Sequence, residues 1–108
     1  MIKRTITQIR PNTSVQFVNI MASGQTLVSE EVKSYIIDNY VTTGKVFFGE
    51  VVVSEDGLTL TIIKIWSNQA AIDEYYADPY IIENLLSVRG AVFATNSISS
   101  TVNDEVMI

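Results

Sequence analysis

The chain has 108 residues, which suits one domain, and we expect a single domain over residues 1–108. It contains no cysteine and no histidine, so disulfides, thiolate nucleophiles, zinc–thiolate sites and histidine bases are excluded. The net charge of −5 and the scatter of only seven basic residues argue against a nucleic-acid-binding surface.

Hydrophobic residues make up 47% of the chain and charged residues 18%. This balance is more apolar than that of an average soluble domain, so either the core is rich or a partner covers apolar surface. The first residues lack the apolar run of a signal peptide, and no stretch approaches the 18 apolar residues of a membrane span. We therefore expect a cytoplasmic protein that does not enter a membrane.

The first third of the chain predicts strands followed by a helix. Residues 2–9 form a weak strand pattern that stops before Pro11, while residues 15–21 alternate well and predict the first full strand. A helix is expected over residues 29–43, where Ser29 is the N-cap and two glutamates occupy the first turn. Gly44 suits the position after that helix.

The rest of the chain predicts a hairpin, a broken helix and a last strand. Residues 45–54 and 58–66 are β-rich and joined by Glu55-Asp56-Gly57, a strong turn signal. Ser67 or Asn68 caps a second helix, which Asp78-Pro79 interrupts.

We expect the continuation of this helix to run to about residue 88 and to end at Gly90. Residues 91–101 then form the last strand, and residues 102–108 form a tail with an apolar end. The resulting order, β-α-β-β-α-β, predicts a ferredoxin-like α+β fold: a four-stranded antiparallel sheet with helices on one face.

The hairpin register assigns side chains to the two faces of the sheet. A three-residue loop would pair Ser54 with Leu58, and side chains alternate across a sheet. One face is then free of charge and is assigned to the helices: Phe47, Gly49, Val51, Val53, Thr59, Thr61, Ile63 and Ile65. The other face carries Val46, Phe48, Glu50, Val52, Leu60, Ile62, Lys64 and Trp66.

Leaving this second face in water would cost on the order of 10 kcal/mol, comparable to the whole stability of a domain. The sequence therefore predicts a homodimer formed through the face that carries Phe48, Leu60, Ile62 and Trp66. On the same face Glu50 would lie diagonal to Lys64, close enough for an ion pair.

The chain resembles the dimeric α+β barrel superfamily, in particular the antibiotic-biosynthesis-monooxygenase-like domain. The resemblance rests on the element order, on Ile62-Ile63-Lys64-Ile65-Trp66-Ser67, and on the helix with Ala70-Ala71-Ile72-Asp73-Glu74-Tyr75-Tyr76, within residues 15–101. It implies that two sheets stack into a barrel and that ligands lie inside the barrel or between sheet and helices.

Members of this group that degrade haem pair an asparagine on the first strand with this tryptophan and a histidine. Asn19 and Trp66 match two of the three, but the chain has no histidine, which argues against haem. We expect no cofactor and no metal site.

The candidates for a ligand pocket are Trp66, Asn19, Tyr75 and the Glu50–Lys64 pair. Trp66 and Tyr75 could stack on a flat ligand or simply pack in the core, and the charged pair could act as acid and base or only fix the sheet register. Arg89 could bind an anion or favour a helix end.

Two functional hypotheses stay open. The first is a non-catalytic dimeric domain that binds a small molecule or serves in assembly, which the lack of a catalytic set favours. The alternative is a cofactor-independent monooxygenase or isomerase that acts on an aromatic or polyketide-like molecule, and this alternative rests on the resemblance.

Overall fold

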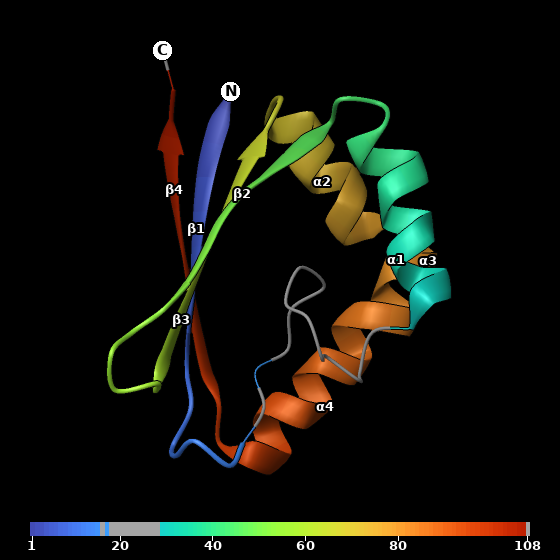
Figure 1. The fold of residues 1–108 in the computed structure, drawn as a ribbon. Helices are drawn as coiled ribbons and strands as arrows, with labels where there is room; N and C mark the ends of the chain where they lie inside the picture. The colour runs from blue at the N-terminus through green and yellow to red at the C-terminus, as the bar shows by residue number, and fades with distance from the viewer. Residues whose placement is uncertain (16, 18–28, 108) are drawn as a thin grey trace.

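A computed structural model describes residues 1–15, 17 and 29–107 of the chain (Figure 1). The helices and strands follow in the order β1 (Ile2–Ile9), α1 (Glu30–Ile36) with its π-helical continuation η1 (Ile37–Val41), β2 (Val46–Val53), β3 (Thr59–Trp66), α2 (Gln69–Ala77), α3 (Pro79–Ile81), the π-helical η2 (Ile82–Leu86), α4 (Ser87–Asn96) and β4 (Ser99–Val106).

The strands form one antiparallel sheet in the order β2-β3-β1-β4, and Figure 1 shows the helices together on one side of it. The predicted α+β, ferredoxin-like fold is confirmed. The position of the first strand is a correction, because residues 2–9 form a full central strand. In the strand predicted over residues 15–21, only Val15 and Phe17 are described, and neither belongs to a strand.

The last strand is a second correction. Residues 91–96, which we expected to begin that strand, continue helix α4, and β4 instead covers much of the predicted tail. Periodicity cannot separate a helix from a strand in a short run such as Ala91-Val92-Phe93-Ala94. Gly90 lies inside α4; Ser97, with a φ of 57°, takes the left-handed conformation that follows the helix.

The predicted helix starts are confirmed. The hydroxyl of Ser29 accepts from the N–H of Val32 at 3.2 Å, and the side chain of Asn68 accepts from the N–H of Ala71 at 2.9 Å. Asp78 caps the segment that begins with Pro79, so the predicted break between α2 and α3 is confirmed as well.

The hairpin of β2 and β3 follows the predicted register only at its far end. Val46 pairs with Trp66 as expected, but a bulge at residues 49–50 shifts the rest by one residue, so Val51 pairs with Ile62. The loop is one residue longer than expected, because the N–H of Ser54 donates to the carbonyl of Thr59. Gly57 takes the predicted left-handed conformation with a φ of 75°.

The face assignment was wrong, and so was the homodimer interface predicted through Phe48, Leu60, Ile62 and Trp66, because the chain's own helices cover that face. The alternate residues of β3 that lie beneath the helices are Leu60, Ile62, Lys64 and Trp66, all of which are buried. The open face carries Thr59, Thr61, Ile63 and Ile65, together with Phe47 and Val52 of β2. The largest side chains occupy the covered face because burying them gains the most, and this gain outweighs the burial of one lysine.

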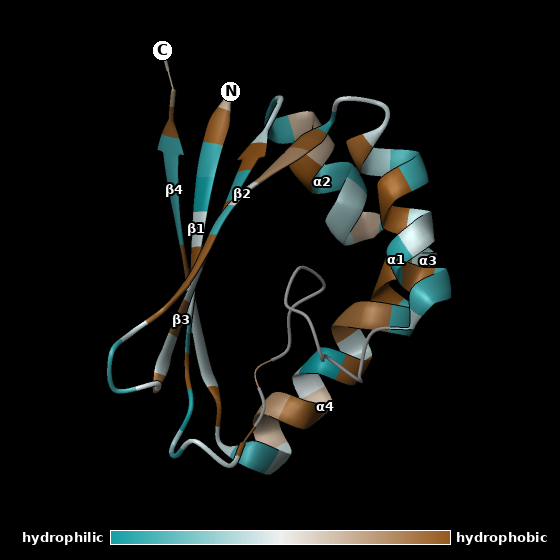
Figure 2. Ribbon diagram, in the orientation of Figure 1, coloured by the Kyte–Doolittle hydropathy of each residue, from teal (hydrophilic) through white to brown (hydrophobic). Residues whose placement is uncertain are grey.

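The two edge strands differ in polarity. Figure 2 shows β2 as hydrophobic along much of its length and the end of β4 as mostly hydrophilic. Asp104 and Glu105 lie in this part of β4, and every residue of the strand is exposed. Charged side chains on an edge oppose pairing with another chain.

Two hydrophobic clusters lie between the sheet and the helices. The aromatic cluster contains Val32, Ile36, Tyr40, Val46, Trp66, Ala71, Ile72, Tyr75, Ile81 and Leu85. The small cluster contains Ile6, Phe17, Leu60 and Ile62, with Val51 packed against it. Along β3, Lys64 separates the two, because Ile62 belongs to the small cluster and Trp66 to the aromatic cluster.

Candidate functional site

Lys64 is the unusual residue of the covered face. Its relative exposure is 7%, and its ammonium lies 5.6 Å from the ring centre of Phe48 and 5.8 Å from that of Tyr75. Within the described ranges it makes no hydrogen bond and no ion pair. A buried charge without a carboxylate partner is costly, and aromatic faces offset only part of that cost.

A row of side chains crosses all four strands at the level of Lys64. Register places Phe48, Lys64, Arg4 and Asp104 side by side on the helix-covered face; we call them the charged row. The guanidinium of Arg4 donates to both carboxylate oxygens of Asp104, at 2.8 and 2.9 Å. Asp104 therefore neutralises Arg4 and leaves Lys64 uncompensated.

The pKa values of the charged row follow from this arrangement. Burial lowers the pKa of Lys64 to about 8, and the charges of Arg89 and Arg4 add to that effect. The hydrogen bond from Arg4 holds the pKa of Asp104 below its ordinary value. Near neutral pH, a measurable fraction of Lys64 is the free amine.

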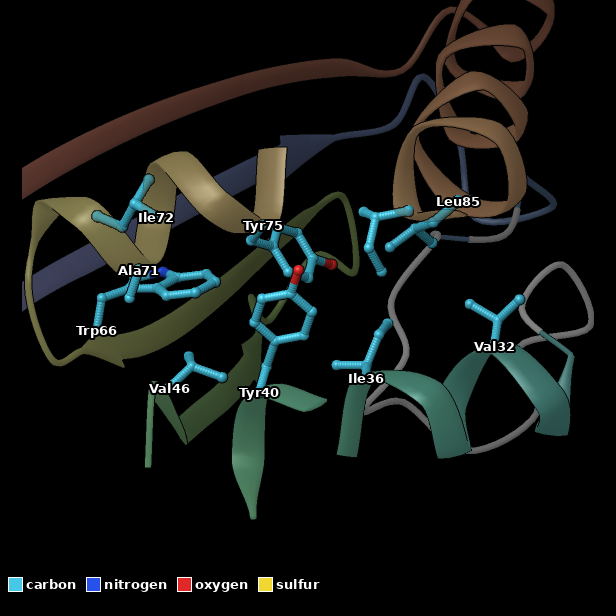
Figure 3. Packing of buried hydrophobic residues seen from close by; sticks show 10 residues of the cluster. Val32, Ile36, Tyr40, Val46, Trp66, Ala71, Ile72, Tyr75 and Leu85 are labelled. Carbon is cyan, nitrogen blue, oxygen red and sulfur yellow. The ribbon is translucent and has the colours of Figure 1, made fainter. Parts of the chain in front are cut away.

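Tyr75 belongs to the aromatic cluster (Figure 3), and its ring also lies beside Lys64 of the charged row. Its ring meets those of Trp66 and Tyr40 edge to face, with centroids 5.3 and 5.0 Å apart. Burial raises the pKa of Tyr75, while the charge of Arg89 acts to lower it. The charge of Arg89, on α4, thus acts on both Lys64 and Tyr75.

The indole N–H of Trp66 is buried and has no hydrogen-bond partner in the part of the chain that the structure describes. Figure 3 shows the indole nitrogen at the end of the ring nearest Ala71, with Tyr75 beyond the opposite end. The ring of Trp66 contacts Tyr75, and through this contact Trp66 belongs to the candidate site.

A second polar group lies on the far side of the aromatic cluster. The hydroxyls of Tyr35 and Tyr40 both donate to one carboxylate oxygen of Asp78 at 2.7 Å. Burial acts to raise the pKa of Asp78, but the hydrogen bonds outweigh it and the pKa is lowered. Since Asp78 also caps α3, we assign this group to the fold.

The structure brings together Lys64, Trp66 and Tyr75 of the predicted site residues. Glu50 does not lie with these three residues, because it is exposed at the bulge of β2. It forms no ion pair within the described ranges, so the predicted Glu50–Lys64 pair was wrong. The bulge shifts the register that the pair required. Asn19 lies outside the described residues.

Sequence reasoning missed Arg4 because residues 2–9 were treated as a weak, separate strand. The signal was present: Ile2, Arg4, Ile6 and Gln8 alternate along that strand, and all four lie on the helix-covered face. Arg89 was considered as an anion-binding residue, and the structure places it on α4, where its charge acts on Lys64.

Neither a metal centre nor a membrane span emerges from the described residues. They contain no group of three acidic, cysteine or histidine side chains able to hold a metal ion. None of their helices is long and apolar enough to cross a bilayer.

No protein-family model and no curated protein matches the chain. The solved structure of Rv0793 from Mycobacterium tuberculosis superposes with a TM-score of 0.54 over 100% of this chain and 96% of its own, at 14% identity. A structure named for an antibiotic biosynthesis monooxygenase of Deinococcus radiodurans gives a TM-score of 0.46 over 99% and 92%, at 13% identity. The first likeness confirms the expected fold.

Proposed function

We propose that this chain is a small-molecule-binding domain whose ligand is aromatic and lies beside Lys64, between the sheet and the helices. The observation that supports this proposal most directly is the burial of Lys64 among Phe48 and Tyr75 with no carboxylate partner within the described ranges. A buried charge without an oppositely charged partner is often found at functional sites.

A pair of adjacent phenylalanines provides the test. Phe48 packs against the aromatic cluster beneath the helices, whereas Phe47 lies on the open face and is 49% exposed. We expect 2-naphthoate or 2-naphthamide to shift the indole N–H resonance of the chain's single tryptophan and to saturate it.

Phe48→Ala should weaken that binding at least fivefold, and Phe47→Ala should leave it unchanged. If neither probe shifts the resonance, or if both variants behave alike, the proposed site is wrong.

A second candidate function follows from the lowered pKa of Lys64. An amine with a pKa of about 8 can act as a general base near neutral pH, the role that histidine, absent from this sequence, most often fills. Removal of a proton from an acidic C–H or O–H of an aromatic substrate is a first step available to a cofactor-independent oxygenase or an isomerase.

Deuterium exchange into 2-indanone, followed by NMR, tests this candidate. Exchange faster than in buffer, rising with pH through about 8 and lost in Lys64→Met, would support base catalysis by this residue. Exchange at the buffer rate would contradict base catalysis by Lys64, and the binding function would then be the one proposed function of this site.

The chain is further proposed to act as a homodimer through the open face of the sheet. Ile9, Phe47 and Val52 lie on this face and are each about half exposed, at 47%, 49% and 51%. Exposed apolar groups gathered on one face are typical of protein interfaces.

Light scattering should show twice the chain mass for the wild type and one chain mass for Val52→Lys. The control Ile82→Lys, at a 42% exposed site on η2, should remain dimeric. A monomeric wild type, or a dimeric Val52→Lys, would exclude this interface.

A further inference from the structure

The groups that surround the proposed ligand share one chemical property: the cations among them are hydrogen-bond donors only. The ammonium of Lys64 and the guanidinium of Arg89 have no acceptor atom. Neither forms an ion pair within the described residues. A ligand that satisfies them must present acceptor oxygens.

The charges that lie between the sheet and the helices also favour an anionic ligand. Asp104 cancels Arg4 through two hydrogen bonds, so Lys64 and Arg89 are the cations near Tyr75 that have no carboxylate partner among the described residues. The carboxylate of Asp78 also acts on Tyr75, but the hydroxyls of Tyr35 and Tyr40 already bind it. This local excess of positive charge occurs in a chain of net charge −5. Overall composition therefore does not account for it.

The surrounding walls are aromatic. Phe48 and Tyr75 lie within 6 Å of the Lys64 ammonium, and Tyr75 also contacts the ring of Trp66. Such walls favour a flat, apolar body next to the charge.

We infer that the site takes an aromatic molecule with one anionic oxygen group, a carboxylate or a phenolate, which lies against Lys64 and is also attracted by the charge of Arg89. This inference rests on the proposed function and adds the chemical class of the ligand. An anion beside Lys64 replaces the carboxylate that the protein does not supply, and it relieves the repulsion between Lys64 and Arg89.

A matched pair of probes tests the charge separately from the ring. 2-Naphthoate and 2-naphthamide have nearly the same shape, but only the first is an anion at pH 7. Calorimetry should show at least tenfold tighter binding of 2-naphthoate to the wild type. Lys64→Met should abolish this preference, because it removes the charge that distinguishes the two probes.

Arg89→Met should reduce the preference. Lys33→Met, at a partly exposed lysine on α1, should not alter it. A third probe, 4-nitrophenol, distinguishes the two anions, since its phenolate absorbs visible light. Enrichment of the bound phenolate at a pH near its own pKa assigns the site to phenolates as well as carboxylates. The lack of such enrichment, with 2-naphthoate still preferred, assigns the site to carboxylates.

The outcomes that contradict the inference are distinct from those that contradict the function. Equal binding of 2-naphthoate and 2-naphthamide overturns the anionic ligand and leaves an aromatic site. A preference that persists in Lys64→Met also overturns it. Binding of neither probe overturns the proposed function and this inference together.

Discussion

The two ends of the layer between sheet and helices are built differently. The aromatic cluster joins ten buried residues from the helices and from the end of the sheet where Val46 pairs with Trp66. The small cluster has four residues, three of which come from the sheet. The charged row lies between them. The comparison indicates that the aromatic cluster holds the helices to the sheet, and that the charged row lies where this packing ends.

The largest expected effect is the loss of Trp66. It is 1% exposed and touches Tyr75, so Trp66→Ala should lower the free energy of unfolding by about 3–5 kcal/mol. Leu60→Ala, the corresponding change in the small cluster, should cost less, about 2–3 kcal/mol. Urea denaturation compares the two, and an equal or larger loss for Leu60→Ala would show that the clusters do not differ as described.

Lys64→Met should instead raise the free energy of unfolding. Because burial lowers the pKa of Lys64 from 10.5 to about 8, the charged lysine destabilises the fold by about 3 kcal/mol below pH 8. Between pH 8 and 10.5 the unfolded chain holds the proton more firmly, so the wild type gains stability relative to the variant as the pH rises. Denaturation at pH 7 and pH 10.5 measures the difference, which should shrink to nearly zero at the higher pH.

Tyr40→Phe tests the polar group behind the aromatic cluster. Loss of the hydrogen bond to Asp78 should cost about 1 kcal/mol at pH 7. Since the pKa of Asp78 is lowered in the fold, this contribution is present above the ordinary aspartate pKa and disappears as the pH falls through the lowered value. Tyr80→Phe is the control, because the described contacts include no hydrogen bond from that hydroxyl.

The smallest effect is expected for Lys45, a half-buried lysine that has the carboxylate partner that Lys64 lacks. Its ammonium lies 2.8 Å from a carboxylate oxygen of Glu74, and both side chains are about a third exposed or more. Lys45→Met should change stability by about 0.5 kcal/mol or less, and 1 M salt should reduce the difference further. A loss above 2 kcal/mol would mean that surface pairs matter more to this fold than the buried row.

The sequence predicted the parts of the fold that local chemistry determines. Ser29, Asn68 and Asp78 cap helices because their side chains reach nearby N–H groups, and Gly57 turns the hairpin because it tolerates a positive φ. The last strand could not be predicted in this way, because its pairing with another strand defines it. β4 is a polar edge strand that gives no apolar signal of its own, and its register with β1 defines it.

Part of the candidate site was also predicted, because some of its residues are close together in the sequence. Trp66 and Lys64 alternate on one strand, and Tyr75 follows on the next helix, so their proximity is encoded within a dozen residues. Two features depended on tertiary structure. The bulge at Gly49 and Glu50 moved Glu50 out of the row, and only the pairing of β1 with β3 brings Arg4 beside Lys64.

The central claim is that Lys64 is a buried cation without a carboxylate partner and that it binds an anionic ligand. The most direct measurement is an NMR titration of the Lys64 side chain, with and without 2-naphthoate. We predict a pKa of about 8 in the free protein and a clear rise when the carboxylate binds. A pKa near 10.5 in the free protein, or no change with the probe, would contradict the account.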